Sequence, residues 1–203
     1  MVIWLGRYAT LSAQNVIDGL GKMTTNVVKN WFEDDFKLLA PQIQTLHTAG
    51  GTLAGEVFVR YGQGIAGLIG KKLGRKLGIP GEGRHRLVVT VAHRNECLQW
   101  DRLFNDKQEM KSVFTPVGTI DGGYWVEKTG PLHIKLTVDI HNGGWYWRCL
   151  SYSFWGIPLP VVLFPPSEAY KRIEDGQYRF YVGFKLWFFG DVLSYGGLLD
   201  VDA

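Results

Sequence analysis

From Arg86 to the end of the chain, apolar residues recur at every second position, whereas before Arg86 they recur at every third or fourth. A repeat of two is typical of a β-strand with one buried face. The clearest run is 132–140, whose predicted buried face carries Leu132, Ile134, Leu136, Val138 and Ile140. A one-residue slip would bury Lys135 and Asp139 instead, so the register is well specified. The second half of the chain is therefore predicted to form a β-sheet.

Turn signals such as Asn142-Gly143-Gly144 separate these runs at hairpin spacing. About eight or nine strands are expected, over 87–93, 96–104, 110–117, 124–128, 132–140, 145–155, 167–174, 177–188 and 192–200. Such short connections exclude parallel crossovers, so the sheet is expected to be an antiparallel meander. A sheet this large with one apolar face has to curl or be covered. We predict an α+β fold, a strongly curved antiparallel sheet, half-barrel or barrel-like, with N-terminal helices packed against it.

A helix is predicted over 31–48, because Phe32, Phe36 and Leu39 begin an apolar stripe at helical spacing. Pro41 lies inside this segment and is expected to kink or divide it. His47 falls at the C-terminal end of the helix, where the helix dipole favours a partly charged imidazole. A short strand is predicted at 55–61.

A second helix is predicted over 64–77 and is expected to end at Gly78. Its four internal glycines weaken it by roughly 1 kcal/mol each relative to alanine, which indicates close packing or a mobile segment. Its polar side carries Lys71, Lys72, Arg75 and Lys76. A basic helix of this kind can lie on an anionic membrane surface. Because the helix itself carries no Trp or Phe, an ordinary solvated lysine face is the favoured interpretation.

These segments indicate a single α+β domain over 23–203, helical at 31–80 and a sheet at 86–200. Residues 1–22 are weakly patterned and are predicted to be an extension. Met23 is therefore an alternative to Met1 as the authentic start.

The formal net charge is only +3, and the excess lies within 71–86. A nucleic acid needs a broad basic face, so none is expected as a partner. The uncharged stretch 149–167 contains four prolines, which a membrane-spanning helix would not tolerate, so no transmembrane segment is expected. No secretory signal is visible at the start, and Cys97 and Cys149 are too few for a disulfide scaffold. These features favour a cytoplasmic location.

Arg102 is the most informative charged residue of the predicted sheet. It shares a strand face with Leu98, Trp100 and Phe104, which are large and apolar, so that face is expected to be buried. One interpretation is an anion clamp inside an apolar pocket. The favoured interpretation is an arginine stacked on tryptophan and paired with a carboxylate. The candidate partners are Glu127 and Glu168.

Other chemistry has weaker support in the sequence. Glu127 and Glu168 could form a carboxylate pair for acid–base catalysis, although nothing in the sequence shows that they are close. The five histidines lack metal-ligand spacing, so no metal site is expected, and no cofactor is expected either. Aromatic residues crowd the strands at 145–155 and 177–188, which indicates either a thick core or an apolar cavity.

Several fragments of the chain resemble one family, domain of unknown function 4166. They are the segment 36–47 ending in Leu46-His47, the glycine-spaced helix closing on Leu77-Gly78-Ile79-Pro80, Trp100-Asp101-Arg102-Leu103-Phe104, Val126-Glu127 with Gly130-Pro131, Gly156-Ile157-Pro158-Leu159-Pro160 with Pro165, and Tyr195-Gly196-Gly197-Leu198. The resemblance spans roughly 31 to 200. It implies no defined chemistry, and relatives are expected either to stand alone or to be fused to a saccharopine-dehydrogenase-like reductase. No dinucleotide fingerprint is present here, so reductase activity is not transferred to this chain.

Three functions remain open from the sequence. The favoured one is non-catalytic binding of a hydrophobic or amphipathic small molecule in an aromatic-lined cavity, with Arg102 as polar anchor. The alternatives are an enzyme using Arg102, Glu127 and Glu168 in a closed cavity, and an interaction or membrane-peripheral module using the basic helix at 64–77. The predicted ligand-binding residues are Trp100, Arg102, Phe104, Glu127, Glu168, Trp147 and Tyr195.

Overall fold

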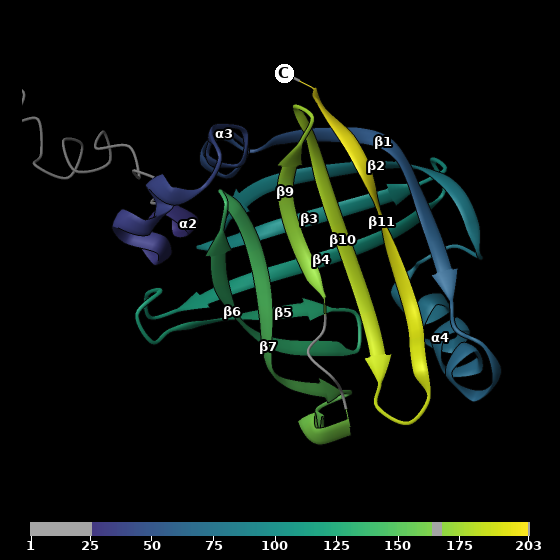
Figure 1. The fold of residues 1–203 in the computed structure, drawn as a ribbon. Coiled ribbons are helices and arrows are strands. Elements are labelled where there is room, and N and C mark those ends of the chain that lie inside the picture. Colours follow the sequence, from purple (N-terminus) through teal and green to yellow (C-terminus); the bar gives the residue numbers. More distant parts are fainter. Residues whose placement is uncertain (1–25, 164–167, 203) are drawn as a thin grey trace, which may run out of the picture.

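A computed structural model describes residues 26–163 and 168–202, which contain one antiparallel sheet of eleven strands (Figure 1). The strands are β1 (Gly51–Tyr61), β2 (Gly83–Arg94), β3 (Cys97–Phe104), β4 (Gln108–Val117), β5 (Tyr124–Thr129), β6 (Leu132–His141), β7 (Gly144–Phe154), β8 (Ile157–Leu159), β9 (Ala169–Glu174), β10 (Gln177–Leu186) and β11 (Gly190–Asp202). The predicted extension at 1–22 lies outside the described residues.

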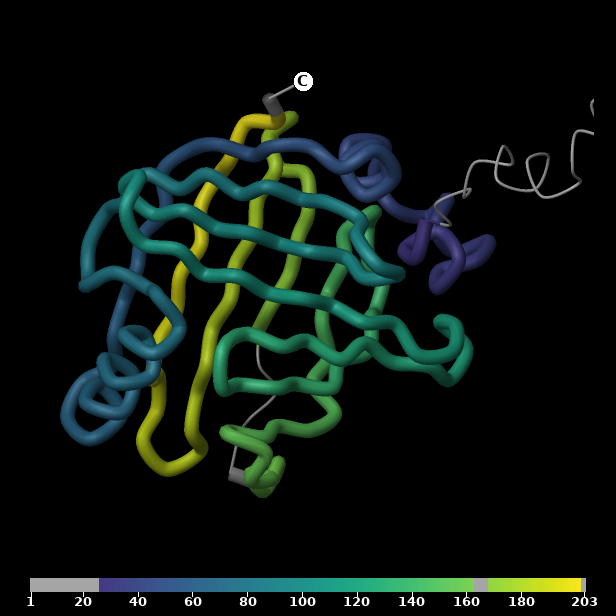
Figure 2. Tube along the Cα trace, turned by 180° about the vertical axis from the view of Figure 1, so that it is seen from behind, coloured from purple at the N-terminus to yellow at the C-terminus, as the bar shows by residue number. Residues whose placement is uncertain are grey.

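The sheet closes into a barrel because its first and last strands pair. β1 runs antiparallel to β11, with Leu53 opposite Val201 and Val59 opposite Tyr195. β7 pairs with both β6 and β9, which completes a ring of ten strands and leaves β8 attached only to β7. Figure 2 shows the ring from behind. The predicted α+β, barrel-like class is confirmed. The strand count is higher than predicted because β1 joins the sheet and Ile157–Leu159 forms β8.

The predicted register of β6 is confirmed. Leu132, Ile134, Leu136 and Val138 are buried in the interior of the barrel, and Lys135 is exposed. Ile140, at the end of the strand, is half-buried. Asp139 points to the other face, where it forms an ion pair with Arg148 on β7. Alternation alone therefore decided which side chains of this strand fill the barrel.

The first predicted helix is divided, as expected, at Pro41. The chain forms α2 (Val27–Phe32), the 3-10 helix η1 (Glu33–Leu38) and α3 (Pro41–Ala49), in which Pro41 is the first helical residue. Proline is tolerated there because the first turn of a helix has no partner for its N–H group. Trp31 and Phe32 are buried against the inward-facing Trp125 and Trp145, with ring centroids 5.5 and 4.6 Å apart. This helical segment therefore contributes aromatic rings to the barrel core.

The second predicted helix is α4 (Gly64–Leu77), and it ends at Gly78 in the left-handed conformation, as expected. It packs on the outside of β1 and β11 (Figure 1). Gly70 and Gly74 face these strands: a Cβ atom on Gly70 would lie 1.9 Å from the carbonyl oxygen of Val192, and one on Gly74 would lie 2.3 Å from the hydroxyl of Tyr61. Of the two predicted explanations for these glycines, close packing is confirmed.

We expect Gly70→Ala to destabilise the protein, although alanine favours an isolated helix by about 1 kcal/mol. The added methyl group would push α4 away from β11, and overpacking of this kind costs about 1–3 kcal/mol. The control is Gly81→Ala, because a Cβ atom there meets no atom within 4 Å. Thermal unfolding of both variants tests the packing. Equal melting temperatures would contradict it.

Candidate functional site

The barrel interior contains a charged residue, Arg102, that β3 places among apolar side chains. Leu98, Trp100, Arg102 and Phe104 all point inward, and the arginine is only 6% exposed. Its guanidinium lies 5.5 Å from the ring of Trp100. The predicted shared face and its burial are confirmed.

A chain of hydroxyl groups links Arg102 to Glu127 across three strands. Arg102 Nη1 donates to Ser112 Oγ at 2.9 Å, Ser112 Oγ lies 2.6 Å from Thr129 Oγ1, and Thr129 Oγ1 donates to Glu127 Oε1 at 2.9 Å. Because Thr129 gives its proton to the carboxylate, Ser112 must donate to Thr129 and accept from the guanidinium. Every hydroxyl in the chain therefore has a fixed direction.

The direct ion pair predicted for Arg102 is wrong. No carboxylate of the described residues lies within 4.0 Å of its guanidinium, since Ser112 and Thr129 stand between it and Glu127. Glu168 is 60% exposed and lies 3.9 Å from Lys185. It precedes β9, so the strand alternation does not direct its side chain into the barrel.

A small inner cavity of about 60 Å³ lies beside this chain. Among the predicted site residues, Arg102, Glu127, Trp147 and Tyr195 line it. Trp100, Phe104 and Glu168 do not. Trp100 and Phe104 instead support the lining: Trp100 lies beside Arg102, and the Phe104 ring meets Tyr195 edge-on at 6.1 Å.

Polar atoms around this cavity have unused hydrogen-bonding capacity. Arg102 Nε and the hydroxyl of Tyr178 are buried without a partner among the described residues. The hydroxyl of Tyr195 has only a sulfur acceptor, Met110 Sδ at 3.8 Å. Burial raises the pKa of both tyrosines, so both remain neutral donors at physiological pH. Of these groups, Arg102 Nε and the Tyr195 hydroxyl belong to residues that line the cavity, so both are donors available to an acceptor there.

A second buried basic side chain, Lys171, was not predicted from the sequence. β9 points this lysine inward, where Nζ lies 4.3, 3.9 and 5.4 Å from the rings of Trp100, Trp145 and Trp147. Nζ also lies 3.2 Å from His47 Nε2. Burial, reinforced by the positive charge of Arg102 and opposed by Glu127, lowers the pKa of Lys171 well below its usual range.

The expected partly charged state of His47 is wrong. The side chain is fully buried, and burial, reinforced by Lys171 and His93, lowers its pKa well below the usual value. Burial inside the barrel outweighs the helix dipole, which contributes only about 0.3–1 kcal/mol at an exposed site. His47 is therefore a neutral partner for the Lys171 amine.

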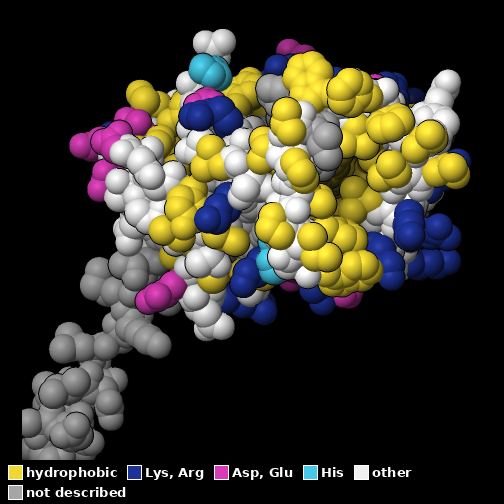
Figure 3. All heavy atoms as spheres, turned by 90° about the horizontal axis from the view of Figure 1, so that it is seen from below, with side chains coloured by type: hydrophobic (Ala, Val, Ile, Leu, Met, Phe, Trp, Pro, Cys, Tyr) yellow, Lys and Arg dark blue, Asp and Glu magenta, His cyan; other side chains and the backbone are white. Residues whose placement is uncertain are grey.

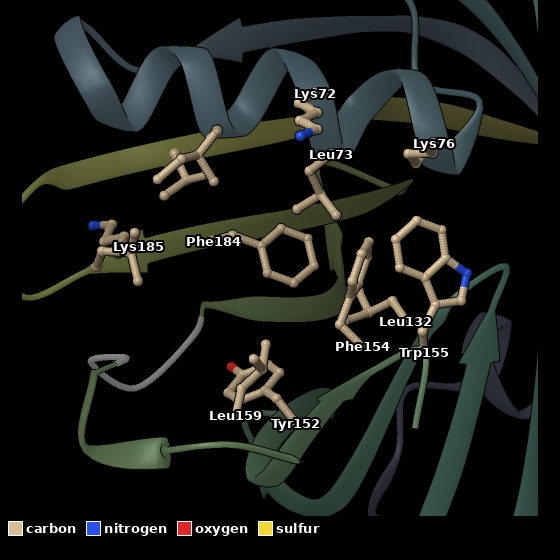
Figure 4. Close-up of a pocket in the computed structure, with 13 residues that line it drawn as sticks. Lys72, Leu73, Lys76, Leu132, Tyr152, Phe154, Trp155, Leu159, Phe184 and Lys185 are labelled. Carbon is tan, nitrogen blue, oxygen red and sulfur yellow. The ribbon is translucent and has the colours of Figure 1, made fainter. Parts of the chain in front are cut away.

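A larger outer pocket of about 380 Å³ opens where α4 meets the ends of the strands (Figure 4). Its lining is mostly apolar and comprises Ile69, Lys72, Leu73, Lys76, Leu132, Tyr152, Phe154, Trp155, Leu159, Phe184, Lys185, Leu186 and Val192. Figure 4 shows Leu73 pointing from α4 into the pocket, where Phe184 and Phe154 face it. Leu132 and Phe184 line both this pocket and the inner cavity, so the two spaces are neighbours.

Sequence reasoning missed this outer pocket because six separate elements contribute to its lining. Leu73 comes from the helix, Phe154 and Leu159 from β7 and β8, and Phe184 from β10. The only signal in the sequence was the crowding of aromatic residues on the strands at 145–155 and 177–188.

We expect Thr129→Val to destabilise the protein by about 1–3 kcal/mol. The change preserves shape but removes both hydrogen bonds of Thr129, which leaves Ser112 without an acceptor and Glu127 without its donor. Thr137→Val is the control, because Thr137 is also buried but has no side-chain hydrogen bond among the described residues. Chemical denaturation measures both. Equal losses of unfolding free energy in the two variants would show that the hydrogen bonds between Arg102 and Glu127 contribute nothing to stability.

We expect the free energy of unfolding to rise between about pH 7 and 8.5, and Lys171→Met to abolish most of that rise. The unfolded lysine binds a proton up to about pH 10.4, whereas the folded amine has a lowered pKa, so raising the pH relieves the cost of burial. Burial raises the pKa of Cys149 to about 11. An unfolded cysteine loses its proton near pH 8.5, so this thiol lowers the free energy of unfolding only above this pH window.

Lys171→Met should also raise the melting temperature at pH 7, since the thioether does not have to lose a proton. Lys135→Met, at an exposed position, is the control. Denaturation at several pH values measures the slopes. Parallel profiles for the wild type and Lys171→Met would contradict the assignment.

No group of three or more metal-ligating side chains occurs among the described residues. Within the same part of the chain, no helix is long and apolar enough to cross a membrane. A family model described as a domain of unknown function (DUF4166) matches residues 39–199. No curated protein matches the chain.

Proposed function

The chain belongs to the DUF4166 family, whose description assigns no activity, and we propose from its geometry that it binds an amphipathic small molecule with an acidic head group. The apolar part of the ligand occupies the outer pocket. The acidic head reaches the inner cavity and binds Arg102.

The outer pocket is the observation on which the proposal depends. Its volume of about 380 Å³ lies within the range of small-molecule sites, roughly 300–1,000 Å³, and apolar side chains line most of it. Burying apolar surface there contributes about 25 cal/mol per Å². An apolar chain is therefore the ligand part that this space accommodates best.

The charge around the inner cavity supports an acidic head group. Arg102 is the one basic residue that lines the cavity, and Glu127 is the one carboxylate among its described lining residues. Arg102 keeps an unpartnered Nε, and a guanidinium binds a carboxylate with two parallel hydrogen bonds. A volume of about 60 Å³ suits a head group no larger than a carboxylate. Leu132 and Phe184 separate the two spaces, so their side chains have to move apart when the ligand enters.

The alternative of an enzyme with two carboxylates has less support. Glu127 faces the inner cavity, whereas Glu168 is exposed beside Lys185. Ligand binding in the outer pocket and the inner cavity, in contrast, does not require Glu168 to lie near Glu127.

We expect the protein to bind a long-chain fatty acid more tightly than the alcohol of the same chain length. Arg102→Met should weaken binding of the acid by about tenfold or more, because it removes a charged hydrogen-bond donor, and should change binding of the alcohol little. Leu73→Trp should weaken binding of both, because it fills the outer pocket. Isothermal titration calorimetry with each ligand measures these affinities.

Leu68→Trp is the control for the pocket variant. Leu68 lies on the same helix but is 69% exposed and does not line the outer pocket. Absence of binding to either ligand by the wild type would overturn the proposal. If Arg102→Met weakened binding of the acid and of the alcohol equally, the pocket would remain the binding site but Arg102 would not be the anchor of the acidic head group.

A further inference from the structure

Three consecutive aromatic residues are exposed at the turn between β10 and β11. Trp187, Phe188 and Phe189 are 62, 85 and 51% exposed. Single exposed apolar residues are ordinary, but a contiguous exposed patch marks an interaction surface. Figure 1 places this turn at the same end of the barrel as β8 and α4. The neighbouring Lys185 and Leu186 line the outer pocket.

A second exposed apolar group follows β7. Trp155 and Ile157 are 66 and 67% exposed, and Val162 in η2 (Val161–Leu163) is 77% exposed. On the helix, Leu68 is exposed and Ile69 is partly so. Figure 3 looks onto this end and shows apolar side chains surrounding a hollow, with lysine and arginine side chains along its edge. We call this surface the docking face, formed by the β10–β11 turn, the β7–β8 turn with η2, and α4.

The charges of the docking face are mainly positive. Lys71, Lys72, Arg75 and Lys76 are exposed on α4, and none has a carboxylate within 4.0 Å among the described residues. Lys76 Nζ lies 5.4 Å from the ring of Trp155, so the basic and aromatic parts are in contact. The nearby carboxylates of Glu168 and Asp191 both lie within 4.0 Å of Lys185.

We propose that the docking face binds the surface of a membrane that contains anionic lipids. Aromatic and aliphatic side chains that project from turns insert at the level of the lipid head groups, and neighbouring cations attract lipid phosphates. The sequence supplied the cations without showing that Trp155, Trp187, Phe188 and Phe189 lie beside them, and the fold brings the two together.

The shape of the docking face favours a bilayer over a protein partner. Its apolar side chains project from two separate turns and from α4, and residues at or beside all three line the outer pocket. The interior of a bilayer conforms to such projections, whereas a protein interface needs close shape complementarity. If the proposed function holds, docking would also place the pocket mouth against the membrane, where an amphipathic ligand is stored.

Co-sedimentation with vesicles tests the proposal. The wild type should bind vesicles of phosphatidylcholine mixed with phosphatidylglycerol, bind pure phosphatidylcholine vesicles more weakly, and lose affinity as salt is raised. Lys72→Glu combined with Lys76→Glu should weaken binding to the mixed vesicles by about tenfold or more. Phe188→Ser should also weaken it by about tenfold, because its phenyl ring would no longer be buried in lipid.

The control variants carry the same kinds of change on the helical segment that packs elsewhere on the barrel. Leu38→Ser replaces an apolar residue that is 59% exposed, and Lys29→Glu reverses an exposed cation on α2. Both should bind mixed vesicles like the wild type. Unchanged thermal unfolding of every variant would show that the fold is intact.

Two results would overturn the proposal. The first is failure of the wild type to bind mixed vesicles. The second is a wild type that elutes as a dimer on gel filtration while Phe188→Ser elutes as a monomer. That result would show that the docking face binds a second copy of the chain. Phe188 does not line the outer pocket, so Phe188→Ser should still bind fatty acid in the absence of vesicles. That measurement distinguishes a failure of membrane docking from a failure of the proposed ligand binding.

Discussion

Pairing between β1 and β11 is the constraint on which the rest of the structure depends. Once the two strands that are farthest apart along the chain form their hydrogen bonds, the sheet has a closed interior that side chains must fill. Antiparallel hairpins can form early because their loops are short, but closure has to overcome the entropy of a loop that includes nearly the whole domain. A residue at the middle of a strand then either faces the interior or faces solvent or a covering helix.

The interior is filled unequally along its length. At one end Trp31 and Phe32 from the helical segment join the tryptophans of β5 and β7, and the core is dense. At the other end, the glycines of α4 let it pack closely on the outside of β1 and β11. This helix lines the outer pocket only with Ile69, Lys72, Leu73 and Lys76. The outer pocket is consistent with that difference, since α4, unlike the helical segment at the other end, contains no aromatic residue.

Two buried basic side chains distinguish this barrel from a purely apolar core. Arg102 is connected to Glu127 through two hydroxyls, and Lys171 is surrounded by three indole rings and a neutral histidine. Within the described part of the chain, neither has a direct carboxylate partner of the kind that usually offsets the cost of burying a charge. Residues with perturbed pKa values near a cavity commonly belong to functional sites. Lys171, whose pKa is lowered, interacts with Arg102, which lines the space in which we place the acidic head group.

The sequence by itself determined the strand faces, the limits of α4 and the burial of Arg102, because each depends on periodicity within one element. Only the tertiary structure decided the closure of the sheet, the outer pocket, the position of Glu168 outside the site and the burial of Lys171. Strand β9 shows the reason. Its inward set is Ala169, Lys171 and Ile173, and its outward set is Tyr170, Arg172 and Glu174. Both faces carry a basic side chain, so alternation alone does not show that the barrel encloses Lys171. That choice depends on β7 and β10, the strands beside it.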